Sequence, residues 1–226
     1  MLLTADGNQR QNTHDVDLDK RIAYRLCTVV NNCTINLYNT NDSGVIMIHG
    51  MIDLETLSTK PNATILTIGG VKFDPYSFTE PSQGMYHRID VDSQTAMGRD
   101  VMQETVEWWG TQPAEVRDEA LGDEDRIDLK YFVKQVNRWS VGVDVFWCQG
   151  PLFDYAILQN FYAQMKVPVP WNYWQIRDSR TLFSLVPRDL NEKRTGLHNA
   201  LEDCYFQARK VQQVFNQLDI KDPSKY

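Results

Sequence analysis

From residue 45 onward, apolar residues cluster in runs that are typical of buried strands. The stretch 45–52 predicts a first strand that leads into Asp53. The stretches 63–73 and 85–91 predict a second and a third strand, and the short separations favour an antiparallel meander. Gly69-Gly70 within the second strand indicates a bulge or a close approach by another part of the backbone.

Later in the chain, apolar positions recur three and four residues apart, which predicts helices. The predicted helices cover 105–109, 113–121, 128–139, 154–164 and 198–217. In the helix at 128–139 the predicted buried face consists of Phe132, Val133, Val136 and Trp139. In the last helix it consists of Ala200, Cys204, Ala208, Val211 and Phe215. The run 143–148 predicts a central strand, so the whole pattern predicts an α/β fold with a mixed sheet and helices on its faces.

Residues 1–44 differ from the rest of the chain, because they are polar, rich in Asn and Thr, and end in a loop-like run at 39–44. Residues 17–30 could form one helix, but that segment is too short to build its own core. We therefore expect an N-terminal extension of unknown role over 1–44 and a functional domain over 45–226.

Composition narrows the class of protein. With 226 residues, 42% of them hydrophobic, the chain suits one α/β domain with or without an appendage. No stretch approaches the roughly 18 apolar residues of a membrane span, and no basic segment followed by an apolar run opens the chain. Cys27, Cys33, Cys148 and Cys204 form no C-x-x-C pair, so we expect reduced thiols in a cytoplasmic protein and no structural zinc. The net charge of −7 disfavours a long footprint on duplex nucleic acid but allows an enzyme that binds one chain end.

Acidic residues stand where predicted strands end and predicted helices begin. Asp53 and Glu55 are two residues apart at the end of the first strand, so their side chains share one face. Carboxylates held together repel each other unless a cation neutralises them, and oxygen ligands select Mg²⁺ or Mn²⁺. Alone this is a weak signal, because an exposed loop with a turn-forming Asp has the same sequence.

Three further residues are candidates for the same site. Asp154 opens a predicted helix after a Gly-Pro turn, a position where Asp is also an ordinary capping residue. Asp203 lies about one and a half turns into the last helix, next to its apolar stripe. His198 precedes that helix and can approach the same site from another direction, although an isolated histidine is more often a surface or cap residue.

Taken together, the motifs D-x-E-T at 53–56, F-D at 153–154 and H-x-A-L-x-D at 198–203 resemble the DEDDh group of 3′→5′ exonucleases, in the ribonuclease H-like superfamily. Further stretches at 105–109, 147–150 and 177–182 are similar to bacteriophage exonuclease A and its bacterial and prophage relatives. The resemblance covers roughly residues 45 to 215. It implies a ribonuclease H-like mixed sheet, with the first three strands antiparallel and the later ones parallel, and helices on both faces. Many members of the wider group have Asn four residues before the middle aspartate, whereas this chain has Gly150.

The resemblance also implies an activity. A 3′→5′ exonuclease of this group hydrolyses phosphodiester bonds at the 3′ end of DNA or RNA and releases nucleoside 5′-monophosphates. Two divalent ions, Mg²⁺ or Mn²⁺, would be held by the catalytic carboxylates of Asp53, Glu55, Asp154 and Asp203, with Asp154 binding the second ion partly through water. His198 would be the general base.

Substrate contacts and partners follow less directly from the sequence. Thr56, Leu57 and Phe153 flank the predicted ligands and are candidates to hold the terminal sugar and base, although core packing explains them equally well. The expected partner is a nucleic acid with a 3′ end, single-stranded or overhanging, and no membrane. Enzymes that resemble this chain often form homodimers, but the sequence leaves the oligomeric state and the choice of DNA or RNA open. The alternative function is a catalytically inactive module, on the same fold, that binds nucleic acid or recruits a partner.

Two other stretches are weaker candidates for contacts with nucleic acid. Lys193 and Arg194 could hold a phosphate, although a solvated loop is the commoner explanation for such a pair. The aromatic run 171–174 could stack on bases, although an aromatic cluster is more often part of a core.

Overall fold

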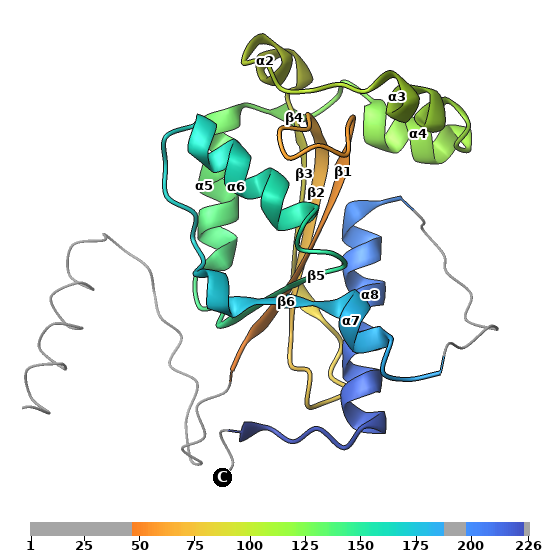
Figure 1. The fold of residues 1–226 in the computed structure, drawn as a ribbon, viewed down its shortest axis with the longest axis vertical. Coiled ribbons are helices and arrows are strands. Elements are labelled where there is room, and N and C mark those ends of the chain that lie inside the picture. The colour runs from red at the N-terminus through yellow and green to blue at the C-terminus, as the bar shows by residue number, and fades with distance from the viewer. Residues whose placement is uncertain (1–46, 188–197, 224–226) are drawn as a thin grey trace, which may run out of the picture. The chain divides into compact units, whose positions relative to one another are not determined.

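The computed structural model describes residues 47–187 and 198–223, and Figure 1 shows their arrangement. The predicted N-terminal extension, 1–44, lies outside the described residues, and so do Lys193 and Arg194. The domain boundary at residue 45 therefore stays a prediction.

A six-stranded mixed sheet, in the order β4-β3-β2-β1-β5-β6, forms the centre of the described domain. Its strands are β1 (His49–Thr56), β2 (Ile65–Phe73), β3 (Ser82–Ile89), β4 (Arg126–Ile127), β5 (Val145–Cys148) and β6 (Ile176–Asp178). The first three form an antiparallel meander, β5 is parallel to β1, and β6 is parallel to β5. The predicted α/β fold, antiparallel at first and parallel later, is confirmed. The short β4 adds a parallel edge beside β3 that the sequence did not predict.

Helices cover both faces of this sheet (Figure 1). They are α2 (Val91–Ala96), α3 (Gln103–Gly110), α4 (Ala114–Leu121), α5 (Leu129–Ser140), α6 (Asp154–Gln164), the 3₁₀ helix η1 (Tyr173–Gln175), α7 (Ser179–Phe183) and α8 (Ala200–Gln217). In Figure 1, α5 and α6 lie on one side of the strands and α7 and α8 on the other. None of the helices in the described ranges combines the length and the apolar character that crossing a membrane requires.

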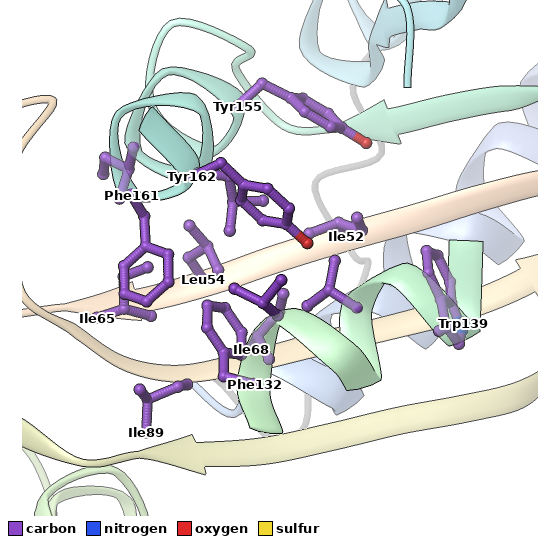
Figure 2. Packing of buried hydrophobic residues seen from close by; sticks show 14 of the residues in the cluster. Ile52, Leu54, Ile65, Ile68, Ile89, Phe132, Trp139, Tyr155, Phe161 and Tyr162 are labelled. Atoms are coloured by element: carbon purple, nitrogen blue, oxygen red, sulfur yellow. The ribbon is translucent and has the colours of Figure 1, made fainter. Parts of the chain in front are cut away.

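The alternation of side chains along β1 divides the core into two clusters. Ile52 and Leu54 pack against α5 and α6 in the larger cluster, part of which is drawn in Figure 2. Met51 points to the other face and packs with residues of α8. Asp53 and Glu55 have the same parity as Met51, so the strand directs both carboxylates to the face that α8 covers.

The buried stripes predicted for the two longest helices are confirmed. Those residues are Phe132, Val133, Val136 and Trp139 of α5, and Ala200, Cys204, Ala208, Val211 and Phe215 of α8. Cys148 and Cys204 are buried free thiols, and burial raises the pKa of both above the ordinary range for cysteine. Cys27 and Cys33 lie outside the described residues.

Two element boundaries differ from the predicted ones in a way that affects the site. β1 begins at His49 and continues to Thr56, so Asp53 and Glu55 lie inside the strand and not beyond its end. α8 begins at Ala200, which places Asp203 in its first turn, closer to the helix start than expected. The first shift places Asp53 and Glu55 on paired strand backbone, and the second places Asp203 at the start of α8.

Candidate active site

Three carboxylates from two distant parts of the chain meet on the α8 face of the sheet. Asp53 and Glu55 come from β1, and Asp203 comes from the first turn of α8. Each contributes one oxygen, and these oxygens all lie within 4.8 Å of one another. A group of this size and chemistry can hold a metal ion.

Gly69 explains how α8 begins so close to β1. It is the direct partner of Asp53 in the antiparallel register of β1 and β2. A Cβ atom on Gly69 would lie 2.1 Å from the carbonyl oxygen of Ala200, a separation that no side chain can adopt. The absent side chain lets the start of α8 lie against β2, which brings Asp203 beside the β1 carboxylates. The close backbone approach predicted at Gly69-Gly70 is therefore confirmed.

Hydrogen bonds fix the first turn of α8. The Asn199 side chain accepts from the backbone N–H groups of Leu201 and Glu202, at 3.1 Å each, and so caps the helix. The backbone N–H of His198, whose φ is 62°, donates to Asp203 Oδ2 at 3.3 Å. Asp203 is thereby tied to the residue just before its own helix.

Gln207 is a further contact to the acidic cluster that the sequence did not single out. It lies one turn after Asp203 on the same side of α8, and its Nε2 donates to Asp53 Oδ1 at 3.0 Å. The spacing of four residues from Asp203 is the signal that could have identified it. α8 thus reaches the β1 carboxylates through two side chains.

Asp154 begins α6 but does not cap it, because the N-cap position belongs to Phe153. Its Oδ1 accepts from the backbone N–H of Leu54 at 3.2 Å, between the two acidic residues of β1. That N–H is available because the pairing of β1 with β5 ends at Met51. Asp154 is 3% exposed and lies outside the group of three oxygens, yet it is anchored to the same strand.

The turn before Asp154 uses the glycine that departs from the wider group. Gly150 has a φ of 130°, a backbone conformation that favours glycine over asparagine. Its carbonyl accepts from the N–H of Phe153 at 2.8 Å, and Arg180 Nη2 donates to the carbonyl of Gln149 at 2.9 Å. These bonds hold the turn that carries Asp154.

The electrostatics of the cluster favour a cation. Burial raises the pKa of Asp53 well above its usual value, and the neighbouring Asp154, Glu55 and Asp203 carboxylates raise it further, against a lowering by the Gln207 hydrogen bond. Burial raises the pKa of Asp154 to about 7. Buried carboxylates this close are unfavourable as bare anions, whereas oxygen donors of this kind suit a hard divalent ion. The residues present therefore fit a divalent metal.

His198 lies at the rim of the cluster, against α3. Its ring packs edge-to-face on Trp108, with centroids 4.8 Å apart, and lies 6.3 Å from the ring of Trp109. Trp109 is buried, and its indole N–H donates to the carbonyl of Thr56 at 2.9 Å. The end of β1, the start of α8 and α3 are thus in contact around this histidine.

A pocket of about 400 Å³ opens beside Glu55, between the end of β1, α3 and the start of α6. Its lining residues are Leu54, Glu55, Thr56, Thr59, Met102, Glu104, Thr105, Trp108, Trp109 and Phe153. Thr56 and Phe153, two of the three predicted substrate contacts, line it. Leu57 instead packs in a small buried cluster with Trp109 beneath α3.

The aromatic run 171–174 divides between core and surface. Trp171 is 4% exposed and packs against Phe146 and Tyr155, as the core explanation predicts. Tyr173 and Trp174 of η1 are exposed, at 80% and 59%.

The fold, the acidic cluster and a matching family model together define the class of protein, a 3′–5′ exonuclease domain on a ribonuclease H-like fold. A family model described as the 3′-5′ exoribonuclease Rv2179c-like domain matches residues 48–215. The chain therefore belongs to the Rv2179c-like family. No curated protein matches the chain in sequence.

Solved structures share the fold at low identity. The nuclease domain of 3′hExo, a DEDDh family member bound to rAMP, has a TM-score of 0.53 and 14% identity, covering 80% of this chain and 98% of that one. Exonuclease I of E. coli in complex with a dT13 oligonucleotide has a TM-score of 0.54 and 13% identity, covering 76% of this chain and 42% of that one. Exonuclease I of Methylocaldum szegediense has a TM-score of 0.53 and 14% identity, covering 76% and 40%. This chain thus spans about two fifths of the exonuclease I chains.

Proposed function

We propose that this chain is a metal-dependent 3′→5′ exonuclease that removes nucleotides from the 3′ end of single-stranded RNA and releases nucleoside 5′-monophosphates. The observation that carries the proposal is the convergence of Asp53, Glu55 and Asp203, whose oxygens lie within 4.8 Å of one another, in a chain of an exoribonuclease family. The family description favours RNA over DNA. The rAMP bound by 3′hExo is also consistent with RNA.

Asp53, Glu55 and Asp203 would hold one divalent ion, and Asp154 would contribute to a second. Mg²⁺ and Mn²⁺ suit a donor set made only of carboxylate oxygens. When bound, two such ions supply positive charge that stabilises the attacking and leaving oxygens of the phosphate. The bond from Gln207 to Asp53 orients one of these carboxylates toward that task.

His198 would act as the general base, taking a proton from the attacking water at an imidazole nitrogen. Histidine exchanges protons near neutral pH, which suits this role. Two contacts support the proposal, because the backbone N–H of His198 donates to Asp203 and the ring of His198 packs edge-to-face on Trp108.

The 400 Å³ pocket would receive the terminal nucleotide. Phe153 and Trp108 offer apolar surface for the base, and Thr56 lies at the end of the strand that carries the proposed ligands. Leu57 would act indirectly, by supporting α3 from below.

We also propose that this chain is related to bacteriophage exonuclease A, that it forms a homodimer and that it is located in the cytoplasm. Two of the stretches that resemble exonuclease A contribute contacts around the site. Trp109 donates a hydrogen bond to the end of β1, and Arg180 donates one to the turn before Asp154. The buried thiols Cys148 and Cys204 are consistent with a reducing compartment.

The test is digestion of RNA and DNA oligonucleotides of matched sequence, labelled at the 3′ or the 5′ end, with Mg²⁺, Mn²⁺ or EDTA. We expect immediate loss of the 3′ label as mononucleotide, a ladder from the 5′-labelled strand, faster turnover of RNA, and no reaction in EDTA. Cleavage that persists in EDTA, or that begins at the 5′ end, would overturn the proposal.

A further inference from the structure

A second hollow, of about 510 Å³, lies between β3 and α5, away from the acidic cluster. Its lining residues are Lys72, Gln83, Gly84, Met85, Tyr86, His87, Gln135, Arg138 and Trp139. Gly70, two residues before Lys72 on β2, faces α5, since a Cβ there would lie 3.0 Å from the Trp139 ring. Gly69 faces α8, as described above. The hollow and the carboxylates therefore lie on opposite faces of the sheet.

A β-bulge shapes this hollow. Gly70 pairs with Met85 but Lys72 pairs with Ser82, so β3 contains one residue more than β2 between these pairs. Gln83, within the bulge, has a φ of 52°, and its carbonyl accepts from the indole N–H of Trp139 at 2.9 Å. The bulge is thus fixed against α5. Trp139, which Figure 2 shows on α5, forms an apolar wall beside it.

Lys72 brings a positive charge into the hollow, and it has no acidic partner in the part of the chain that the structure describes. It is 9% exposed, and its Nζ donates to the carbonyl of Val141, a neutral group, at 2.9 Å. Burial lowers the pKa of Lys72, and no carboxylate among the described residues offsets this effect. Within the described ranges Lys72 forms no ion pair. A buried ammonium in this situation is stabilised by an anion placed next to it.

Arg138 adds a second cation at the mouth of the hollow. It is exposed, and Lys134 and Lys130 precede it by four and eight residues on α5, so the three form one stripe along the exposed side of the helix. In the described part of the chain none of the three forms an ion pair. The lining contains no Asp or Glu, although the whole chain has 30 acidic and 23 basic residues. The local charge is therefore opposite to the net charge.

We propose that this hollow binds a backbone phosphate of the single-stranded RNA substrate, upstream of the nucleotide being removed. Lys72 and Arg138 would supply the charge, and the side-chain amides of Gln83 and Gln135 would supply neutral donors. Because the hollow and the carboxylates are on opposite faces, only a strand long enough to pass around the sheet reaches both. The proposal rests on the proposed exonuclease function for the identity of the RNA, and it adds a dependence on substrate length.

The test compares the full chain with Arg138→Gln, Lys72→Gln and, as a matched control, Lys166→Gln, which changes an exposed lysine just after α6. Hydrolysis of single-stranded RNAs of about 4 and about 20 nucleotides is measured over a range of salt concentrations, with binding of the longer RNA followed by fluorescence anisotropy. We expect Arg138→Gln to raise KM and Kd for the longer RNA by about three- to tenfold at low salt, and to reduce the salt slope by about 1. Its kinetics on the short RNA, and every value for Lys166→Gln, should match wild type.

Unchanged values for the longer RNA in Arg138→Gln and Lys72→Gln would overturn the proposal, and so would equal losses on both lengths. Calorimetry with inorganic phosphate distinguishes the source of the anion. If Arg138→Gln abolishes phosphate binding but leaves the affinity for RNA unchanged, the hollow is a site for free anions, and the proposed RNA contact is contradicted. If wild type hydrolyses neither RNA, the exonuclease function fails. In that case, binding of the longer RNA, measured by anisotropy in wild type and Arg138→Gln, still tests whether the hollow contacts RNA.

Discussion

The carboxylate of Asp53 is the residue on which the account of the site depends most. It shares a strand with Glu55, lies within reach of Asp203, and accepts a hydrogen bond from Gln207. Its pKa is raised by burial and by its acidic neighbours, so without a cation it is a source of instability. Function and stability therefore oppose each other at this position.

Asp53→Asn tests that opposition. Loss of a metal ligand should lower the hydrolysis rate by roughly a hundredfold or more. An acid whose pKa is raised on folding destabilises the fold when it is ionised. Replacing Asp53, which its neighbouring carboxylates repel, should therefore raise the melting temperature of the metal-free protein at pH 8. Activity assays and thermal melts in EDTA measure both effects, with the exposed Asp92→Asn as control. Full activity in a folded Asp53→Asn protein would contradict the ligand assignment.

His49 gives a pH dependence that is separate from the acidic cluster. Its ring is buried, its Nδ1 accepts from the Trp147 indole at 3.0 Å, and burial lowers its pKa to about 4. The unfolded chain then binds more protons than the native protein between pH 6.5 and 4, so the free energy of unfolding falls as the pH falls through this window. The loss amounts to at most about 3 kcal/mol.

Denaturant unfolding of wild type and His49→Gln at pH 7 and pH 4.5 measures this contribution. Gln keeps a polar acceptor and does not titrate, so the wild type should lose more stability than the variant on acidification. Equal losses in the two proteins would show that His49 is protonated without cost.

At the scale of elements, the site depends on how closely α8 approaches β2. The helix is capped by Asn199 and seated over Gly69, and this contact sets the position of Asp203. Of the elements in the described ranges, the longer ones were predictable because their apolar periodicity extends over several turns or a full strand. β6 and α7 are too short for such periodicity, and β6 is a strand only through its pairing with β5.

Gly69→Ala directly tests the close contact between the start of α8 and β2. The new methyl group would overlap the backbone of Ala200, so the start of the helix must move away, with a loss of about 2–3 kcal/mol in stability and most of the activity. Gly110→Ala is the matched control, because a Cβ there meets nothing within 4 Å, and it should leave both values within about 1 kcal/mol and twofold of wild type. Thermal melts and hydrolysis rates check the pair. A Gly69→Ala protein that behaves like Gly110→Ala would show that α8 does not depend on this contact.

At the scale of the whole molecule, the sequence predicted the sheet order of the first three strands and the acidic residues that converge. The resemblance of D-x-E-T and H-x-A-L-x-D to the motifs of a known family carried that information, because this fold places the elements with these motifs side by side. Gln207 could have been found from its spacing of four residues from Asp203 on α8. The contact of Trp108 with His198 and the contact of Gly69 with Ala200 were not predictable, since each joins two elements that no local pattern relates. The hollow at Lys72 is of the same kind, because it depends on a bulge and a neighbouring helix.

The central claim is that Asp53, Glu55 and Asp203 hold divalent metal together. Calorimetric titration of the full chain with Mn²⁺, in the presence of AMP, tests it most directly. We predict saturable binding by wild type and at least about a tenfold weaker affinity in Asp203→Asn, whose substitution at the start of α8 leaves the β1 carboxylates in place. Mn²⁺ binding that is equally strong in wild type and in Asp203→Asn would contradict the account.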